Sequence, residues 1–194
     1  MAETAQQHAT YADLEAVPAN LVAEILFGTL VTHPRPMLRH GVAASVLGME
    51  LGSPFQRRRG GPGGWVFIDE PQLHFGPHVT VPDIAAWRLE RMPRIPTTVG
   101  ITTPPDWLCE VLSPSTAKYD RGDKFRIYAT YGVKHAWLVD PVLRTLEAYE
   151  LRDGKWLLLD VKKDNDDIAL PPFDAVTWPL DALWPFDEAD PAAT

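Results

Sequence analysis

The stretch Trp107-Leu108-Cys109-Glu110-Val111-Leu112 decides the fold, because it is a strongly apolar run interrupted by a single charge. Such a run is typical of a strand that is buried on both faces of a sheet. Ser113 to Thr116 break the run, and the pattern that follows predicts a helix from about Tyr119 to Tyr131, with Gly132 as its C-cap. The residues His135 to Asp140 read as the next strand. Together these segments predict one strand–helix–strand crossover.

The flanking sequence extends this unit to an α/β fold with a central mixed β-sheet flanked by helices and a C-terminal β-hairpin. The hairpin signal is Asp153-Gly154 between two apolar segments. A capping box at Thr10–Asp13 predicts a short helix that Pro18 ends, and Leu21 to Leu30 reads as a helix end followed by a strand. A helix is expected at Leu38–Leu51, where Val42, Ser45, Val46 and Met49 recur at helical spacing. Two further strands are expected at Trp65–Ile68 and Thr80–Trp87.

The length of 194 residues predicts a single domain, residues 1–194, with frayed tails at 1–9 and 187–194. The chain shows no signal peptide and no apolar run that could span a membrane, so we expect a soluble, cytoplasmic protein. The net charge of −8 argues against broad nucleic-acid binding. Residues 57–134, however, carry 11 basic and 8 acidic side chains. This segment is either a locally basic surface on which a polyanion docks or ordinary solvated surface.

Two lone acids in apolar strands are the main chemical signal. A carboxylate at Glu110, inside the apolar run, must be paired or coordinated if it is buried. The alternatives are an edge position or a partner arginine. Asp83 lies in a second apolar segment, and if the two strands are neighbours both carboxylates meet at one end of the sheet. Hard cations such as Mg²⁺ take oxygen ligands of this kind.

Lys124 is a third candidate, since it falls in the first turns of the helix that follows the Glu110 strand. Its alternatives are a solvated surface lysine and a simple i,i+4 partner of Asp120. The single cysteine, Cys109, is interpreted as a buried and inert thiol. No cysteine or histidine cluster has the spacing of a zinc site.

The chain resembles a known family in the block Pro105 to Thr116, in Asp120, Lys124 and Tyr128, and in the stretch Tyr131 to Pro141. Upstream, Pro82-Asp83 and the positions Glu24, Gly28 and His40 also match. The family is the Uma-type restriction endonucleases of the PD-(D/E)XK nuclease superfamily. The resemblance covers about Thr10 to Pro141 and implies a restriction-endonuclease-like fold.

The resemblance also implies site residues. Asp83, Glu110 and Val111 would bind the catalytic metal, and Glu24 would be an accessory acid. The superfamily usually places a lysine two residues after the acid, where this chain has Leu112. Members of the resembling family supply the lysine from the following helix, which is Lys124 here.

The implied function is a Mg²⁺- or Mn²⁺-dependent DNA endonuclease that uses no organic cofactor. Because duplex cleavage needs two active sites or two binding events, we also expect a homodimer. Arg57-Arg58-Arg59 and the start of the helix Lys118–Arg126 are expected to form a basic face around the acidic site. The alternative from a different class is a non-catalytic or weakly active nuclease-fold DNA-binding or accessory protein linked to mobile DNA. The departure at Leu112 and the overall acidity favour this alternative.

Overall fold

The computed structural model describes residues 8–34 and 37–185. The expected frayed tail at 187–194 and most of the one at 1–9 lie outside these residues. Within the described part, Ala9 is tied down, because its N–H donates a hydrogen bond of 2.8 Å to the carbonyl of Gly28. No helix in the described residues is long and apolar enough to cross a membrane.

A six-stranded mixed sheet forms the centre of the molecule, in the strand order β10-β9-β8-β7-β6-β3. β7 and β8 are parallel, and every other neighbouring pair is antiparallel. The α/β fold with a mixed sheet and a C-terminal hairpin is therefore confirmed. The strands are β3 (Trp65–Asp69), β6 (Ile84–Arg88), β7 (Trp107–Val111), β8 (His135–Asp140), β9 (Thr145–Arg152) and β10 (Lys155–Lys163).

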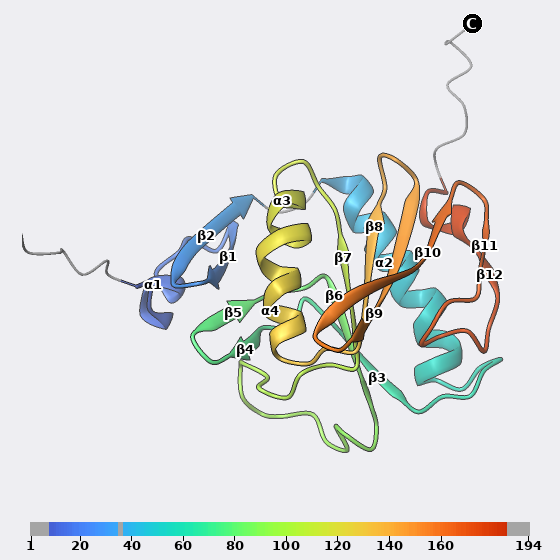
Figure 1. Ribbon diagram of the computed structural model, residues 1–194, viewed down its shortest axis with the longest axis horizontal. Coiled ribbons are helices and arrows are strands. Elements are labelled where there is room, and N and C mark those ends of the chain that lie inside the picture. The colour runs from blue at the N-terminus through green and yellow to red at the C-terminus, as the bar shows by residue number, and fades with distance from the viewer. Residues whose placement is uncertain (1–7, 35–36, 186–194) are drawn as a thin grey trace, which may run out of the picture.

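The crossover between β7 and β8 contains three short helical pieces. They are α3 (Ala117–Tyr119), the π-helical turn η2 (Asp120–Lys124) and α4 (Phe125–Thr130). Figure 1 shows α3 and α4 on one side of the six-stranded sheet and α2 (Leu38–Leu51) on the other. The predicted strand–helix–strand unit is thus present, although it includes a π-turn that the sequence pattern did not reveal.

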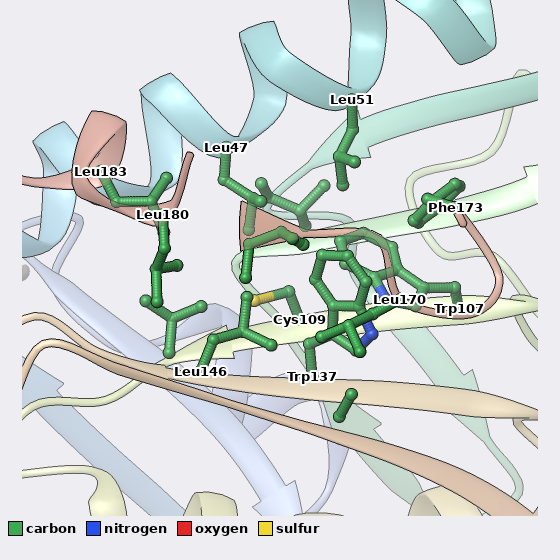
Figure 2. Close-up of a cluster of buried hydrophobic side chains, with 14 of the residues drawn as sticks. Leu47, Leu51, Trp107, Cys109, Trp137, Leu146, Leu170, Phe173, Leu180 and Leu183 are labelled. Atoms are coloured by element: carbon green, nitrogen blue, oxygen red, sulfur yellow. The ribbon is translucent and has the colours of Figure 1, made fainter. Parts of the chain in front are cut away.

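Alternating residues of β7 feed two separate cores, as expected for a central strand. Cys109 and Val111 belong to the core beneath α2. Figure 2 shows Cys109 in this core, with Leu47 and Leu51 of that helix. Leu108 belongs to the opposite core, beneath α4. Cys109 is fully buried, and burial raises the pKa of its thiol well above the usual value, as expected for an inert cysteine.

A second, smaller sheet lies beyond α4 in Figure 1, with the strand order β2-β1-β5-β4. It was not predicted, and the helix expected at the start of Leu21–Leu30 is wrong. That segment is a strand and a tight hairpin turn, in which Phe27 and Gly28 both have positive φ, of 50° and 78°. The four strands are β1 (Leu21–Leu26), β2 (Thr29–Pro34), β4 (Leu73–Phe75) and β5 (His78–Thr80).

The strand expected at Thr80–Trp87 is also corrected, because the chain changes sheets there. β5 ends at Thr80 in the small sheet and β6 begins at Ile84 in the large one. Pro82 lacks an N–H group and cannot continue a ladder between them. Asp83 consequently lies at the junction of the two sheets.

The remaining elements support the ends of the fold. α1 (Tyr11–Glu15) begins with the predicted capping box between Thr10 and Asp13. The C-terminal segment covers the α2 face of the sheet and contributes Trp178, Leu180 and Leu183 to its core. The other elements are the π-helical turn η1 (Gly52–Gln56), β11 (Asp167–Ile168), β12 (Trp178–Pro179) and the 3-10 helix η3 (Leu180–Leu183).

Candidate active site

Asp83 and Glu110 lie side by side at one end of the neighbouring central strands β6 and β7. β6 and β7 are antiparallel with Ile84 opposite Cys109, so the residue before β6 lies beside the end of β7. The main-chain N–H of Val111 donates a hydrogen bond of 2.7 Å to Oδ2 of Asp83. The predicted neighbouring position of the two acids is thus observed, with Asp83 just outside its strand.

Lys124 lies at the centre of three carboxylates that come from distant parts of the chain. Its Nζ lies 2.9 Å from Glu110, 3.1 Å from Oε1 of Glu24 and 3.2 Å from Oδ1 of Asp120. All four side chains are nearly inaccessible, with side-chain exposures of 2–3%. A solvated surface lysine is therefore excluded, and the i,i+4 contact with Asp120 is only one part of a larger network.

Tyr128 completes this network, since its hydroxyl donates a hydrogen bond of 2.5 Å to Oε1 of Glu110. Asp120, Lys124 and Tyr128 are spaced by four residues along the crossover helix, which brings them to one face of it. Glu110 belongs to a central strand, flanked by β6 and β8. The two alternatives for Glu110, an edge position and a partner arginine, are therefore wrong, because its partners are a lysine and a tyrosine.

The electrostatics of the cluster reflect three carboxylates that share one ammonium group. Burial lowers the pKa of Lys124, but the surrounding carboxylates outweigh burial and raise it well above the usual value. Burial raises the pKa of Glu110 well above its usual range, with only partial opposition from Lys124. Burial also raises the pKa of Asp120. The cluster thus holds an excess of buried negative charge, which favours the uptake of protons or cations.

Glu24 differs from the other two acids. Burial raises its pKa, but Lys124, His33 and the N–H of Val81 outweigh burial, so the pKa of Glu24 is lowered. Nε2 of His33 lies 3.5 Å from Oε2 of Glu24, and the N–H of Val81 donates a hydrogen bond of 2.7 Å to Oε1. The predicted accessory acid therefore reaches the site as a charged residue from β1, in the small sheet.

His40, in the first turn of α2, also belongs to the site, although the helical spacing of apolar residues did not predict that it faces inward. Its Nε2 lies 3.1 Å from Oδ1 of Asp83, and the residue is 7% exposed. The buried positions of α2 are His40, Ala43, Leu47 and Leu51, so the expected apolar stripe, based on Val42 and Met49, was on the wrong face. A histidine that continues the spacing of this buried stripe is the signal that could have identified it.

These residues surround a small cavity of about 30 Å³, which has room for about one water molecule or one ion. Its lining includes Asp83, Glu110, Val111, Asp120 and Lys124. Oδ2 of Asp120 is buried and has no hydrogen bond of good geometry among the described residues, although the side chain of Thr116 lies close enough to lower the pKa of Asp120. Carboxylate oxygens and an unpartnered buried oxygen fit the ligand chemistry of a hard divalent cation.

The described residues do not, however, include a group of three or more His, Cys, Asp or Glu side chains already arranged around a metal position. Glu110 is engaged by Lys124 and Tyr128, and Asp83 by Val111 and His40. The donors for a cation are therefore present, but cation binding requires some of them to change partners.

The arginine loop does not frame this site. His40 is near the first turn of α2, whereas Arg57-Arg58-Arg59 follow η1 at the other end of this 14-residue helix, about 20 Å away. None of the three arginines lines the cavity. The start of the crossover helix does adjoin the site through Asp120 and Lys124, but its Arg121 is held by Glu147, with N–O distances of 2.6 and 2.9 Å. Only one half of the expected basic face therefore lies beside the acidic site.

The overall fold matches that of a protein of known structure. The crystal structure of a protein from Anabaena variabilis, described as "a putative nuclease belonging to DUF820", superimposes with a TM-score of 0.73 at 22% sequence identity. The match covers 91% of this chain and 98% of that one. The chain therefore has the restriction-endonuclease-like fold that the resemblance implied.

The family itself follows from the sequence comparison. Residues 8–181 match the model of the Uma2 family, which is described as "Putative restriction endonuclease", so the chain belongs to that family. The uncharacterized protein slr1290 of Synechocystis sp. is 37% identical over 75 residues, which are 38% of this chain. That match spans 40% of the length of the relative. Family and fold together support a nuclease.

Proposed function

We propose that this protein is a divalent-metal-dependent DNA endonuclease whose site consists of Asp83, Glu110, Lys124 and Glu24. The observation that carries the proposal is the convergence of three buried carboxylates on Lys124, beside Asp83, in a chain of a nuclease family. Such a surplus of buried negative charge costs stability and is retained where function needs it. Mg²⁺ or Mn²⁺ is the cofactor that fits the oxygen donors.

Each residue has a distinct part in this proposal. Asp83, Glu110 and the main chain of Val111 would hold the cation, which when bound would neutralise the phosphodiester and lower the pKa of water. Lys124 would present a fixed positive charge to the negative charge that develops on the phosphate. Glu24, held by His33 and Val81, would keep the ammonium group of Lys124 in place.

The direct test of the proposal is metal-dependent stabilisation combined with metal-dependent cleavage. We expect Mn²⁺ and Mg²⁺ to raise the melting temperature of the full chain with increasing concentration, by mass action on the folded state. We also expect cleavage of single-stranded, double-stranded or branched DNA only when one of these ions is present. A melting temperature that does not respond to either ion, together with intact DNA substrates, would contradict the proposal.

The accessory-protein alternative has one observation in its favour. Lys124 already neutralises part of the charge of Glu24, Glu110 and Asp120 without any metal, as a purely structural ion-pair network would. Under this alternative the protein would bind DNA without cutting it, and its DNA affinity would not depend on Mg²⁺. The same titration therefore separates the two functions.

We propose further that the active form is a homodimer. Cutting both strands of a duplex requires two sites or two binding events, and a two-fold dimer supplies two sites in a fixed relation. We expect sedimentation velocity at micromolar concentration to show a dimer, either alone or with duplex DNA. A monomer under both conditions would contradict this expectation without affecting the chemistry of the site.

A further inference from the structure

The buried carboxyl group of Asp120 has one oxygen in an ion pair and one without a well-formed hydrogen bond. Oδ1 lies 3.2 Å from Nζ of Lys124, whereas Oδ2 is buried and has no hydrogen bond of good geometry among the described residues, although the side chain of Thr116 is near enough to lower the pKa of this carboxyl group. The side chain is 2% exposed and lines the cavity that also contains Asp83 and Glu110. Burying a carboxylate oxygen without a partner lowers the stability of the fold. A cation or a hydrogen-bond donor in the cavity would remove this cost.

Pairing with Lys124 alone does not account for Asp120. The ammonium group has three N–H donors, and it is already within 2.9 Å of Glu110 and 3.1 Å of Glu24. Asp120 adds a third carboxylate to a single positive charge, which leaves the cluster with a surplus of buried negative charge. If the cluster were only a structural ion pair, one carboxylate would be enough to balance the charge of Lys124. A cation site, by contrast, requires the additional negative charge.

The cavity brings donors and one fixed cation together. It has a volume of about 30 Å³, and Asp83, Glu110, Asp120 and Lys124 all line it. Lys124, held by three carboxylates on the cavity wall, already supplies one positive charge there.

We propose that Asp120 is a third carboxylate ligand of a single exchangeable divalent cation, shared with Asp83 and Glu110, and that Lys124 supplies the second positive charge of the site. This inference rests on the proposed function, since it adds a ligand to the same cation site. The local helix supports it, because Asp120 and Lys124 are the first and last residues of the π-turn η2, a rare element that recurs at functional sites.

The test is Mn²⁺ titration of the full chain by calorimetry and by thermal melting, using Asp120→Asn. The amide keeps an oxygen for Lys124 but removes the charge, so the fold is expected to persist with an unchanged or higher melting temperature without metal. We expect the Kd for Mn²⁺ to rise at least about tenfold, the size of about 1.4 kcal/mol in binding free energy. Asp120→Glu keeps the carboxylate and should lose less affinity than Asp120→Asn.

Asp123→Asn is the matched control, because Asp123 belongs to the same π-turn but does not line the cavity. Its affinity for Mn²⁺ should equal that of the unaltered chain. Unaltered affinity in Asp120→Asn, when the unaltered chain binds Mn²⁺, would overturn the assignment of Asp120 and leave the proposed nuclease function standing. A chain that binds no Mn²⁺ at all would overturn both.

Discussion

Replacing Asp83 by Asn should lower metal-dependent DNA cleavage by at least about 10³-fold while the fold persists, because the proposed metal-binding charge is lost. The side-chain oxygen of asparagine can still accept the hydrogen bond that the N–H of Val111 now donates to Oδ2. Its amide group can face His40, which lies 3.1 Å from Oδ1. The contacts that hold the junction between the two sheets are therefore retained, and the loss should be confined to activity.

Glu110→Gln should give a similar loss of activity for a related reason. Burial already raises the pKa of Glu110 well above its usual range, so a neutral side chain of the same shape is tolerated at this position. The single oxygen of glutamine can accept from both Tyr128 and Lys124, which both reach Oε1 of the glutamate, but its NH2 group then replaces the oxygen that Lys124 also contacts. Cleavage rates should be measured beside thermal melting of each metal-free variant, with Glu90→Gln, an exposed acid outside the cavity, as the control. An Asp83→Asn variant that still cuts DNA at the control rate would remove this residue from the site.

The parts of the fold that the sequence predicted are those with a strong local signal. α2 has the predicted bounds Leu38–Leu51, and β8 has the predicted bounds His135–Asp140. The hairpin turn at Asp153-Gly154 is present, with positive φ at both residues. In each case the local pattern and the tertiary environment favour the same conformation, which is why local reasoning was sufficient.

The small sheet could not be predicted because its strands are short and its turn is atypical. β4 and β5 have three residues each, which is too few for an alternating pattern. The β1–β2 turn places Phe27, rather than Asn or Asp, at a position of positive φ. Gly28 was the single turn signal. The strands are instead held by long-range packing, because their side chains Leu26, Val31 and Phe75 are buried in the core beneath α4.

The candidate site was predictable in its acids but not in its environment. Lone carboxylates in apolar runs pointed to Asp83 and Glu110, and the antiparallel pairing of β6 with β7 then brings them together. The burial of Lys124 was not predictable from composition, because lysines are almost never fully buried unless they are paired. Its three partners come from β1, β7 and η2, and only the folded chain brings these segments together.

The structure gives Lys124 a structural part beside its proposed catalytic one, because it is the shared counter-ion of three buried carboxylates. Lys124→Met should destabilise the metal-free protein by about 3–5 kcal/mol at neutral pH, the size expected for breaking a buried ion pair. Glu24, Glu110 and Asp120 would then be buried without their shared cation. Lys118→Met, an exposed lysine of the same crossover, should change the free energy of unfolding by less than about 0.5 kcal/mol.

The pH dependence of the Lys124→Met variant separates this explanation from a simple packing defect. Lys124 now lowers the pKa of all three carboxyl groups, so without its ammonium group the folded-state pKa of Glu24 rises, and those of Glu110 and Asp120 rise further above their ordinary values. A group with a raised folded-state pKa contributes stability that is present below its unfolded pKa and is lost as the pH rises through its folded pKa. The loss in free energy of unfolding of Lys124→Met, relative to the unaltered chain, should therefore be largest at neutral pH. This loss should shrink as the pH falls towards about 5.

Urea denaturation of Lys124→Met, Lys118→Met and the unaltered chain at several pH values measures this dependence directly. Mn²⁺ should reduce the deficit at neutral pH, because a divalent cation in the cavity would replace part of the missing positive charge. A deficit that stays constant from neutral to acidic pH would show that Lys124 acts through its packed side chain. In that case the excess negative charge around Glu110 would not be the feature that makes this cluster bind cations.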